Sequence, residues 1–208
     1  MLTLVEKEIA MTLAEALTDY GISQHLFDDG EGNLLDWTEE NKLCALGFCF
    51  FTGMTKVCIS HRDLEGWVLK VGFTRAVSQD YARREYEVYC LAEDAGLIDY
   101  FPETVFIGEF GGIPFYAQRK ACCQEDDVST DWYNRLTEQY DNCGEEYTDD
   151  DIWDVICNME DYERVMLCFN DKNLAEFLKE NCIGDLHEGN FGYIGYRLVI
   201  VDFSGWVG

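Results

Sequence analysis

Hydrophobic positions in the first part of the chain recur with the spacing of an α-helix. The stretch "MLTLVEKEIAMTLAEAL" predicts an amphipathic helix. The apolar face that this spacing predicts consists of Val5, Ile9, Leu13, Ala16, Leu17 and Tyr20. The acidic stretch "FDDGEGN" follows, and its composition is typical of a loop. Residues 1–42 are therefore expected to form an N-terminal helix and an acidic loop.

Residues 43–73 show a different pattern, in which short apolar and β-branched runs alternate with turn signals. The runs are "KLCALGFCFF", "TKVCIS" and "WVLKVGF", and they predict a meander of two or three strands. The segment "HRDLEG" separates the last two runs. We expect it to be a hairpin connection, because Asp and Gly favour turns.

A helical pattern then runs from about Gln79 to Ala95, and Gly96 stands where a helix commonly ends. Two strand-like runs follow, "TVFIGEF" and "IPFYAQRKA", joined at the Gly111-Gly112 turn. Residues 43–120 are thus predicted to be a strand-rich lobe that contains one helix.

The remainder of the chain, residues 121–208, is predicted to be mostly helical. Residues 122–181 follow a helical and acidic pattern, and "NFGYIGYRLVIVDF" predicts a terminal hairpin that turns near Gly195. The predicted fold class is therefore α+β, with a strand-rich N-lobe, one inserted helix, and a small helical C-lobe that ends in a β-hairpin.

The composition narrows the class of protein. With 208 residues, 48% of them hydrophobic, the chain can build a sizeable core. No apolar run approaches the roughly 18 residues of a membrane span. The start of the chain lacks the pattern of a signal peptide. We expect a cytoplasmic protein, in the host cytoplasm if a phage encodes it, whose ten cysteines are reduced and hold no structural zinc.

The net charge is −26, from 41 acidic and 15 basic residues. Such a charge repels free nucleic acid and attracts basic partners. Residues 121–181 alone carry 18 acidic and 4 basic side chains. Two interpretations stay open: a solvated surface that keeps the protein soluble, or a surface that competes with nucleic acid for a host protein.

The segment "GDLHEGN", Gly184 to Asn190, holds the strongest signal for chemistry. Phosphoryl transfer needs a carboxylate that accepts the nucleophile's proton and oxygen ligands for Mg²⁺. Asp185 and Asn190 lie five residues apart, and "RLVIVDF" then leads to Asp202 at a strand end. Asp202 alone could equally be a turn residue. The joint pattern of D-x₄-N, a hairpin-length gap, four apolar residues and D-F is much more specific.

The letters His61-Arg62-Asp63-Leu64 imitate the start of a kinase catalytic loop. A catalytic loop, however, needs a metal-binding Asn five residues after the Asp, where this chain has Val68. We interpret this segment as a turn only.

Lys70 lies inside the apolar run "WVLKVGF". It could guard an edge strand, but the following helix supplies a test. Glu85 falls on the apolar face of that helix, and Glu87 falls on the opposite, polar side. A carboxylate that points into a core needs a cationic partner, because its burial alone costs several kcal/mol. Lys70 is the candidate partner.

These motifs together resemble the protein-kinase-like superfamily. "REYEVYCL" resembles the helix that carries the paired glutamate in that fold, and "GDLHEGN" resembles the "GDLHPGN" catalytic loop of small-molecule and atypical kinases. The stretch "WVLKVGF", the Trp soon after "DF" and the small size resemble the short early-gene serine/threonine kinases of podophages. The resemblance covers roughly residues 43–206.

The resemblance implies a role for each motif residue. Asp185 would be the catalytic base, and Asn190 and Asp202 would bind Mg²⁺. Lys70 would bind the phosphates of ATP, and Glu85 would orient Lys70.

The resemblance also implies two nucleotide-binding segments. "LGFCFFTG" would take the place of the glycine-rich loop, with Gly47 as its first glycine. Cys49 stands where a second glycine is usual, which puts the close approach of this backbone to phosphate in doubt. Tyr116 to Lys120 would bind adenine.

The chain departs from the family pattern at two places. Ile183 replaces a histidine before the catalytic loop, and only six residues follow Asp202. We therefore expect no activation segment. A substrate surface would come from residues 121–181, the N-terminal helix or a second subunit.

Two functions follow as hypotheses. The first is an ATP- and Mg²⁺-dependent kinase of Ser or Thr in host proteins, with a small-molecule kinase of the aminoglycoside or choline type as a branch. The second is a catalytically weak or inactive kinase-like acidic protein that inhibits a basic host nucleic-acid-binding or defence protein. Both predict host proteins as partners, with no direct nucleic acid and no membrane, and leave a homo-oligomer open.

Overall fold

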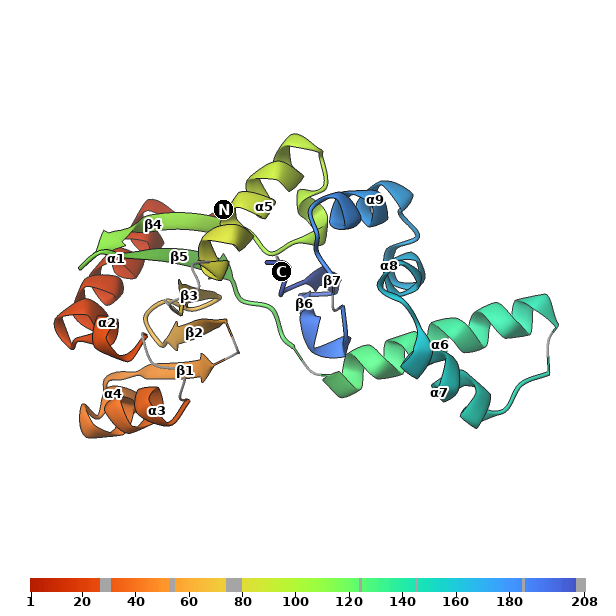
Figure 1. Ribbon diagram of the computed structural model, residues 1–208, viewed down its shortest axis with the longest axis horizontal. Coiled ribbons are helices and arrows are strands. Elements are labelled where there is room, and N and C mark those ends of the chain that lie inside the picture. The colour runs from red at the N-terminus through yellow and green to blue at the C-terminus, as the bar shows by residue number, and fades with distance from the viewer. Residues whose placement is uncertain are drawn as a thin grey trace. The chain divides into compact units, whose positions relative to one another are not determined.

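The computed structural model describes two compact units of the chain (Figure 1). The first unit comprises residues 1–98 and 102–120, and the second comprises residues 99–101 and 121–208. The structure describes residues 1–26, 31–52, 55–73, 80–123, 125–144, 146–184 and 186–204, with the side chains of 31–33 and 125–126 left aside.

The first unit is built on a five-stranded antiparallel sheet in the order β1-β2-β3-β5-β4. Its strands are β1 (Phe48–Thr52), β2 (Lys56–His61), β3 (Trp67–Gly72), β4 (Thr104–Phe110) and β5 (Ile113–Arg119). The β2–β3 connection lies where the "HRDLEG" turn was predicted, and β4 and β5 join at Gly111 and Gly112. Both hairpin predictions are confirmed.

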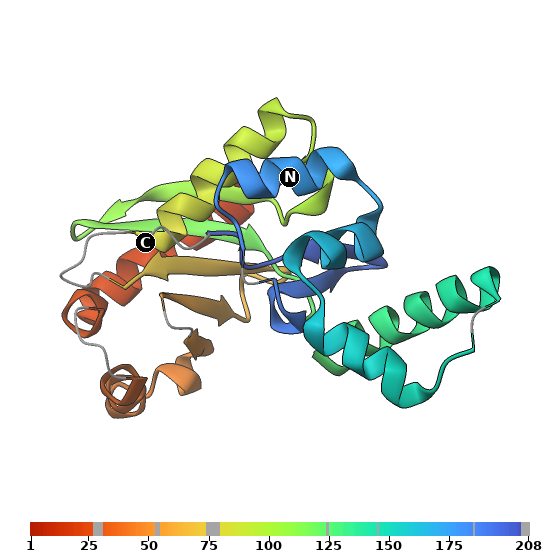
Figure 2. The same cartoon turned by 45° about the vertical axis from the view of Figure 1, so that its right-hand side comes forward.

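Helices cover both faces of this sheet (Figure 2). One face packs on α1 (Leu4–Asp19), α2 (Ile22–His25), α3 (Glu31–Glu40) and α4 (Leu43–Leu46). The other face packs on α5 (Tyr81–Asp94). Because side chains alternate along a strand, Trp67, Leu69 and Val71 point into the core shared with α1–α4, and Lys70 points to the α5 side.

The structure corrects two details of the first unit. Helix α1 forms as predicted, but it buries Ala10, Leu13, Ala14 and Leu17. Val5 and Tyr20 of the predicted face are 65% and 41% exposed, because the small alanines give the closest approach to the core. Residues 43–46 form α4 instead of a strand, since a short apolar run does not distinguish the two states.

Helix α5 has the predicted extent and end. Asp80 caps its start, where the side-chain carboxylate accepts a hydrogen bond from the backbone N–H of Arg83. Gly96 follows the end of the helix with φ +73°, a conformation that favours glycine.

The second unit is helical and ends in a hairpin. Its helices are α6 (Glu125–Cys143), α7 (Asp149–Asn158), α8 (Asp161–Phe169) and α9 (Lys172–Glu180). Strands β6 (Phe191–Ile194) and β7 (Arg197–Ile200) pair antiparallel after the 3₁₀ turn η2 (Glu188–Asn190), and the turn η1 (Ile98–Tyr100) lies earlier in the chain. The predicted α+β fold class is confirmed.

Acidic residues of the second unit stabilise a helix where they lie at its N-terminal end. Helix α7 starts with Asp149, Asp150 and Asp151, which lie at the positive end of the helix dipole. Thr148 and Asp151 also form a reciprocal capping box at this end. Among the described residues, none of the helices combines the length and apolarity that a membrane crossing requires.

Candidate functional site

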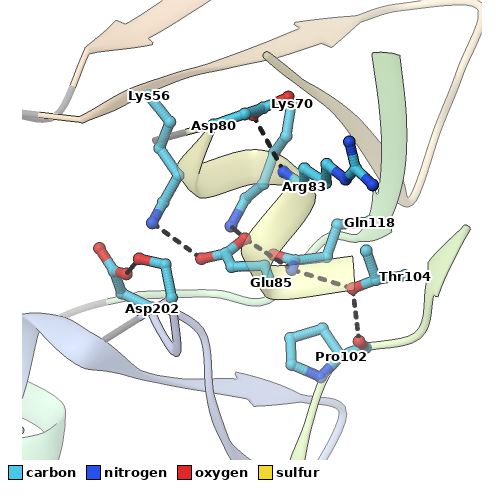
Figure 3. Close-up of polar contacts among 10 residues, drawn as sticks. Lys56, Lys70, Asp80, Arg83, Glu85, Pro102, Thr104, Gln118 and Asp202 are labelled. Atoms are coloured by element: carbon cyan, nitrogen blue, oxygen red, sulfur yellow. Dashed lines mark hydrogen bonds and ion pairs between the residues drawn. The ribbon is translucent and has the colours of Figure 1, made fainter. Parts of the chain in front are cut away.

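Lys70 and Glu85 form the predicted ion pair inside the first unit (Figure 3). Strand β3 pairs with β2 on one side and β5 on the other, so Lys70 does not lie on an edge strand. Its Nζ lies 2.7 Å from Oε2 of Glu85, and the Glu85 residue is 0% exposed. The helical periodicity of α5 thus placed this carboxylate correctly.

Sequence reasoning missed a second lysine at this carboxylate. Lys56 is 5% exposed, and its Nζ lies 2.9 Å from Oε1 of Glu85, in ion-pair contact without hydrogen-bond geometry. The register pairs Lys56 with Gly72 and Cys58 with Lys70, so both lysines lie on the same face of neighbouring strands. The alternation of side chains in "TKVCIS" could have identified Lys56, because it places Lys56 and Val57 on opposite faces of the sheet.

Two further polar residues hold Glu85 from the β4–β5 side. The Gln118 amide donates to Oε2 of Glu85 at 3.3 Å and to Oγ1 of Thr104 at 3.1 Å. The Thr104 hydroxyl in turn donates to the carbonyl of Pro102 at 3.0 Å. Figure 3 shows this chain of contacts ending on the carboxylate. Glu85 is therefore fixed by groups from β2, β3 and β5 together.

The start of α5 lies against the end of β3. The Asp80 side chain contacts Gly72, where a Cβ atom would collide with the carboxylate. Burial raises the pKa of Asp80. The absence of a side chain at Gly72 thus lets the first turn of α5 lie close to the strand that carries Lys70.

The second unit brings Asn190 and Asp202 to the same end of the terminal hairpin. Phe191 pairs with Ile200, and the Val201 N–H donates to the Asn190 carbonyl at 2.9 Å. Oδ1 of Asp202 accepts a hydrogen bond from the Ser204 hydroxyl at 3.2 Å. A carboxylate and an amide carbonyl are hard oxygen donors of the kind that Mg²⁺ binds, so this pair fits the ion.

The predicted base Asp185 lies outside the described residues, but its neighbours are described. The Leu186 N–H donates to Oδ1 of Asp161 at 2.8 Å. A Cβ atom at Gly184 would lie 3.1 Å from Oδ2 of the same carboxylate. Asp161, near the start of α8, therefore contacts the chain on both sides of residue 185. Nothing distinguished Asp161 from the other acidic residues of this segment in the sequence.

The described part of the chain, which leaves out Asp185, contains no group of three or more His, Cys, Asp or Glu side chains that could hold a metal ion.

The segment implied to take the place of the glycine-rich loop, residues 46–53, runs from the end of α4 into β1, and residue 53 lies outside the described residues. Gly47 ends α4 with φ +106°, before β1, and the Arg62 side chain packs against it. Cys49 is an exposed residue of β1.

Tyr116 to Lys120 is the segment that the resemblance predicts to bind adenine. The segment lies in and directly after β5, which is paired with β3 and β4 on both sides. The N–H groups of Arg119 and Lys120 donate to the carbonyls of Glu103 and Gly66. These peptide groups are therefore already engaged.

Comparison with known proteins gives little. No protein-family model matches the chain, and no curated protein matches it. A solved structure with some likeness is an aminoglycoside phosphotransferase from Alicyclobacillus acidocaldarius subsp. acidocaldarius DSM 446, at 13% identity and a TM-score of 0.31. The match covers 75% of this chain and 61% of that enzyme. A likeness of this size does not place the chain in a family.

Proposed function

We propose that the chain is an ATP- and Mg²⁺-dependent phosphotransferase of the protein-kinase-like type, and that it modifies Ser or Thr in host proteins. The observation that carries this proposal is the buried ion pair of Lys70 and Glu85. Burying charges is costly, and apolar residues of similar volume commonly serve stability as well or better. A role in phosphate binding therefore explains this buried ion pair between β3 and α5 better than a contribution to folding stability does.

Each residue then has a stated task. Lys70, oriented by Glu85, binds the α- and β-phosphates of ATP. Asn190 and Asp202 would hold the metal through their side-chain oxygens, and Asp185 would accept the proton of the substrate hydroxyl. Mg²⁺ bound there would neutralise negative charge on the phosphates.

The test is phosphate transfer from γ-labelled ATP. Purified protein is incubated with Mg²⁺, labelled ATP and bacterial lysate, and the Asp202→Asn and Asp185→Ala variants are run beside it. We expect labelled phosphoserine or phosphothreonine in discrete protein bands with the wild type only. Unchanged labelling in either folded variant would contradict the assigned roles. Label found only in small molecules would favour the small-molecule kinase branch instead.

A second candidate function rests on the charge of the second unit. Among the described residues from 127 to 180, the exposed acidic ones are Asp127, Glu138, Asp141, Glu146, Asp149, Asp150, Asp151, Asp154, Glu160, Glu163, Glu176 and Glu180. A surface of this charge would bind a basic host protein and inhibit it without catalysis.

The two candidates predict different responses to the same variant. Inhibition by the acidic surface would weaken steeply with added salt and would survive Asp185→Ala. A pull-down of basic host proteins at two salt concentrations, with wild type and variant, measures both effects. Loss of the biological effect through Asp185→Ala alone would exclude the purely inhibitory function.

A further inference from the structure

The two oxygens of Glu85 are each held by a different lysine. Lys70 contacts Oε2 at 2.7 Å and Lys56 contacts Oε1 at 2.9 Å (Figure 3). The side chains of the two lysines are 5% and 6% exposed, so solvent screens neither contact strongly. The proposed phosphate-binding role uses Lys70 and Glu85 only, and it leaves the buried Lys56 without a task.

The geometry suggests what Lys56 does for its neighbours. If Lys70 were the sole cation on Glu85, a phosphate that attracted Lys70 would leave a fully buried carboxylate poorly compensated. Such a carboxylate is costly, and this cost would oppose nucleotide binding. Because Lys56 holds the other oxygen, Glu85 keeps a cationic partner while Lys70 is shared with a phosphate.

The same contact also bears on how α5 is held. Glu85 lies on α5, Lys56 on β2 and Lys70 on β3, so the carboxylate ties the helix to two strands of the sheet. Removal of either lysine alone leaves one of these ties in place.

We propose that Lys56 is a positioning residue of the phosphotransfer site, which holds Glu85 independently of Lys70 and so allows Lys70 to bind a nucleotide phosphate. This inference rests on the proposed function for its second half only. The anchoring of α5 can be measured without any nucleotide.

The first experiment is a double-variant cycle on the full chain without ATP. Hydrogen exchange of the α5 amides is measured in the wild type, Lys56→Met, Lys70→Met and the double variant. Methionine suits this buried site because it is apolar and of similar length. We expect each single variant to keep most of the protection of α5, and the double variant to lose far more than the sum of both. If Lys70→Met alone exposes α5 as fully as the double variant, Lys56 does not hold Glu85 independently.

The second experiment measures ATP kinetics in Lys56→Met, Lys56→Arg and the control Lys172→Met. Lys172 is an exposed lysine at the start of α9. We expect Lys56→Met to raise KM for ATP about tenfold with a smaller change in kcat, and Lys56→Arg to restore much of the loss. A KM equal to that of the wild type would overturn the proposed help to Lys70. A wild type that binds no ATP would overturn the proposed function, and the exchange cycle would still decide the anchoring role.

Discussion

Glu85 is the residue on which the polar interior of the first unit depends. The helical periodicity of the α5 sequence placed the Glu85 carboxylate on the buried face and so predicted a lysine partner. The structure contains both the buried carboxylate and the lysine. Lys56 was missed because alternation along a short strand shows that two sets of side chains point to opposite faces, but not which face a helix covers. The sequence also did not predict the hydrogen bond between Gln118 and Thr104. The two residues lie opposite each other because of the register between β4 and β5, which the sequence does not show.

Substitution of Glu85 tests how much its carboxylate contributes to the free energy of unfolding. Glu85→Gln would remove the charge that both lysines contact, and we expect the free energy of unfolding to fall by about 3 kcal/mol. The control is Glu87→Gln on the same helix, because Glu87 is 46% exposed and pairs with Arg83 at the surface. That change should cost less than about 0.5 kcal/mol. Urea unfolding of both variants measures the difference, and equal losses would contradict the assigned importance of Glu85.

At the scale of elements, the sequence predicted the existence of α1, α5 and three hairpins well. In these segments the runs of alternating apolar and polar residues are long enough to distinguish a period of 3.6 from a period of 2. Glycines mark the turns between them. The prediction was wrong at residues 43–46, which form α4 instead of a strand. This apolar run is too short to show a period of either kind.

One hydrogen bond between η1 and α9 in the second unit leads us to expect that folding stability depends on pH. The Tyr100 hydroxyl donates to Oδ2 of Asp171 at 2.6 Å, at the start of α9. This hydrogen bond raises the pKa of Tyr100 from 10.0 to about 12 and lowers the pKa of Asp171. The raised tyrosine pKa gives stability that is complete below pH 10 and is lost as the pH rises toward 12. The lowered carboxyl pKa gives stability above the usual value of 3.8 that is lost in more acidic solution.

Tyr100→Phe isolates this bond, because phenylalanine can keep the ring contact with Phe169. We expect the variant to lose about 1 kcal/mol of unfolding free energy at neutral pH, a modest value because solvent reaches the pair. The gap between wild type and variant should shrink at about pH 11. Urea unfolding at both pH values provides the measurement, and a gap that stays constant would contradict the pKa of Tyr100.

At the scale of the whole molecule, charge and core composition were predictable and the packing of the N-terminus was not. Leu17, Ile22 and Trp37, from residues 1–42, share the core with strands of the sheet, and the sequence made no prediction of this packing. Amphipathic periodicity shows that a helix has a face to bury, but not where that face is buried.

The net charge of −26 makes a prediction for the chain as a whole. Repulsion among carboxylates opposes the compact state, and salt screens it. We therefore expect the midpoint of urea unfolding to rise as NaCl increases from about 0.02 M to about 0.3 M. Urea is the suitable denaturant because it carries no charge. A midpoint that falls with salt would indicate that attractive ion pairs outweigh the repulsion.

We propose that the chain binds ATP through Lys70 and Mg²⁺ through Asp202. Isothermal titration of ATP into purified protein, with and without Mg²⁺, tests it most directly, with Asp202→Asn and Lys172→Met beside the wild type. We predict Mg²⁺-dependent binding that Asp202→Asn weakens at least about tenfold and that Lys172→Met leaves intact. A folded wild type that binds no ATP at about 1 mM with Mg²⁺ present would exclude the proposed phosphotransferase function.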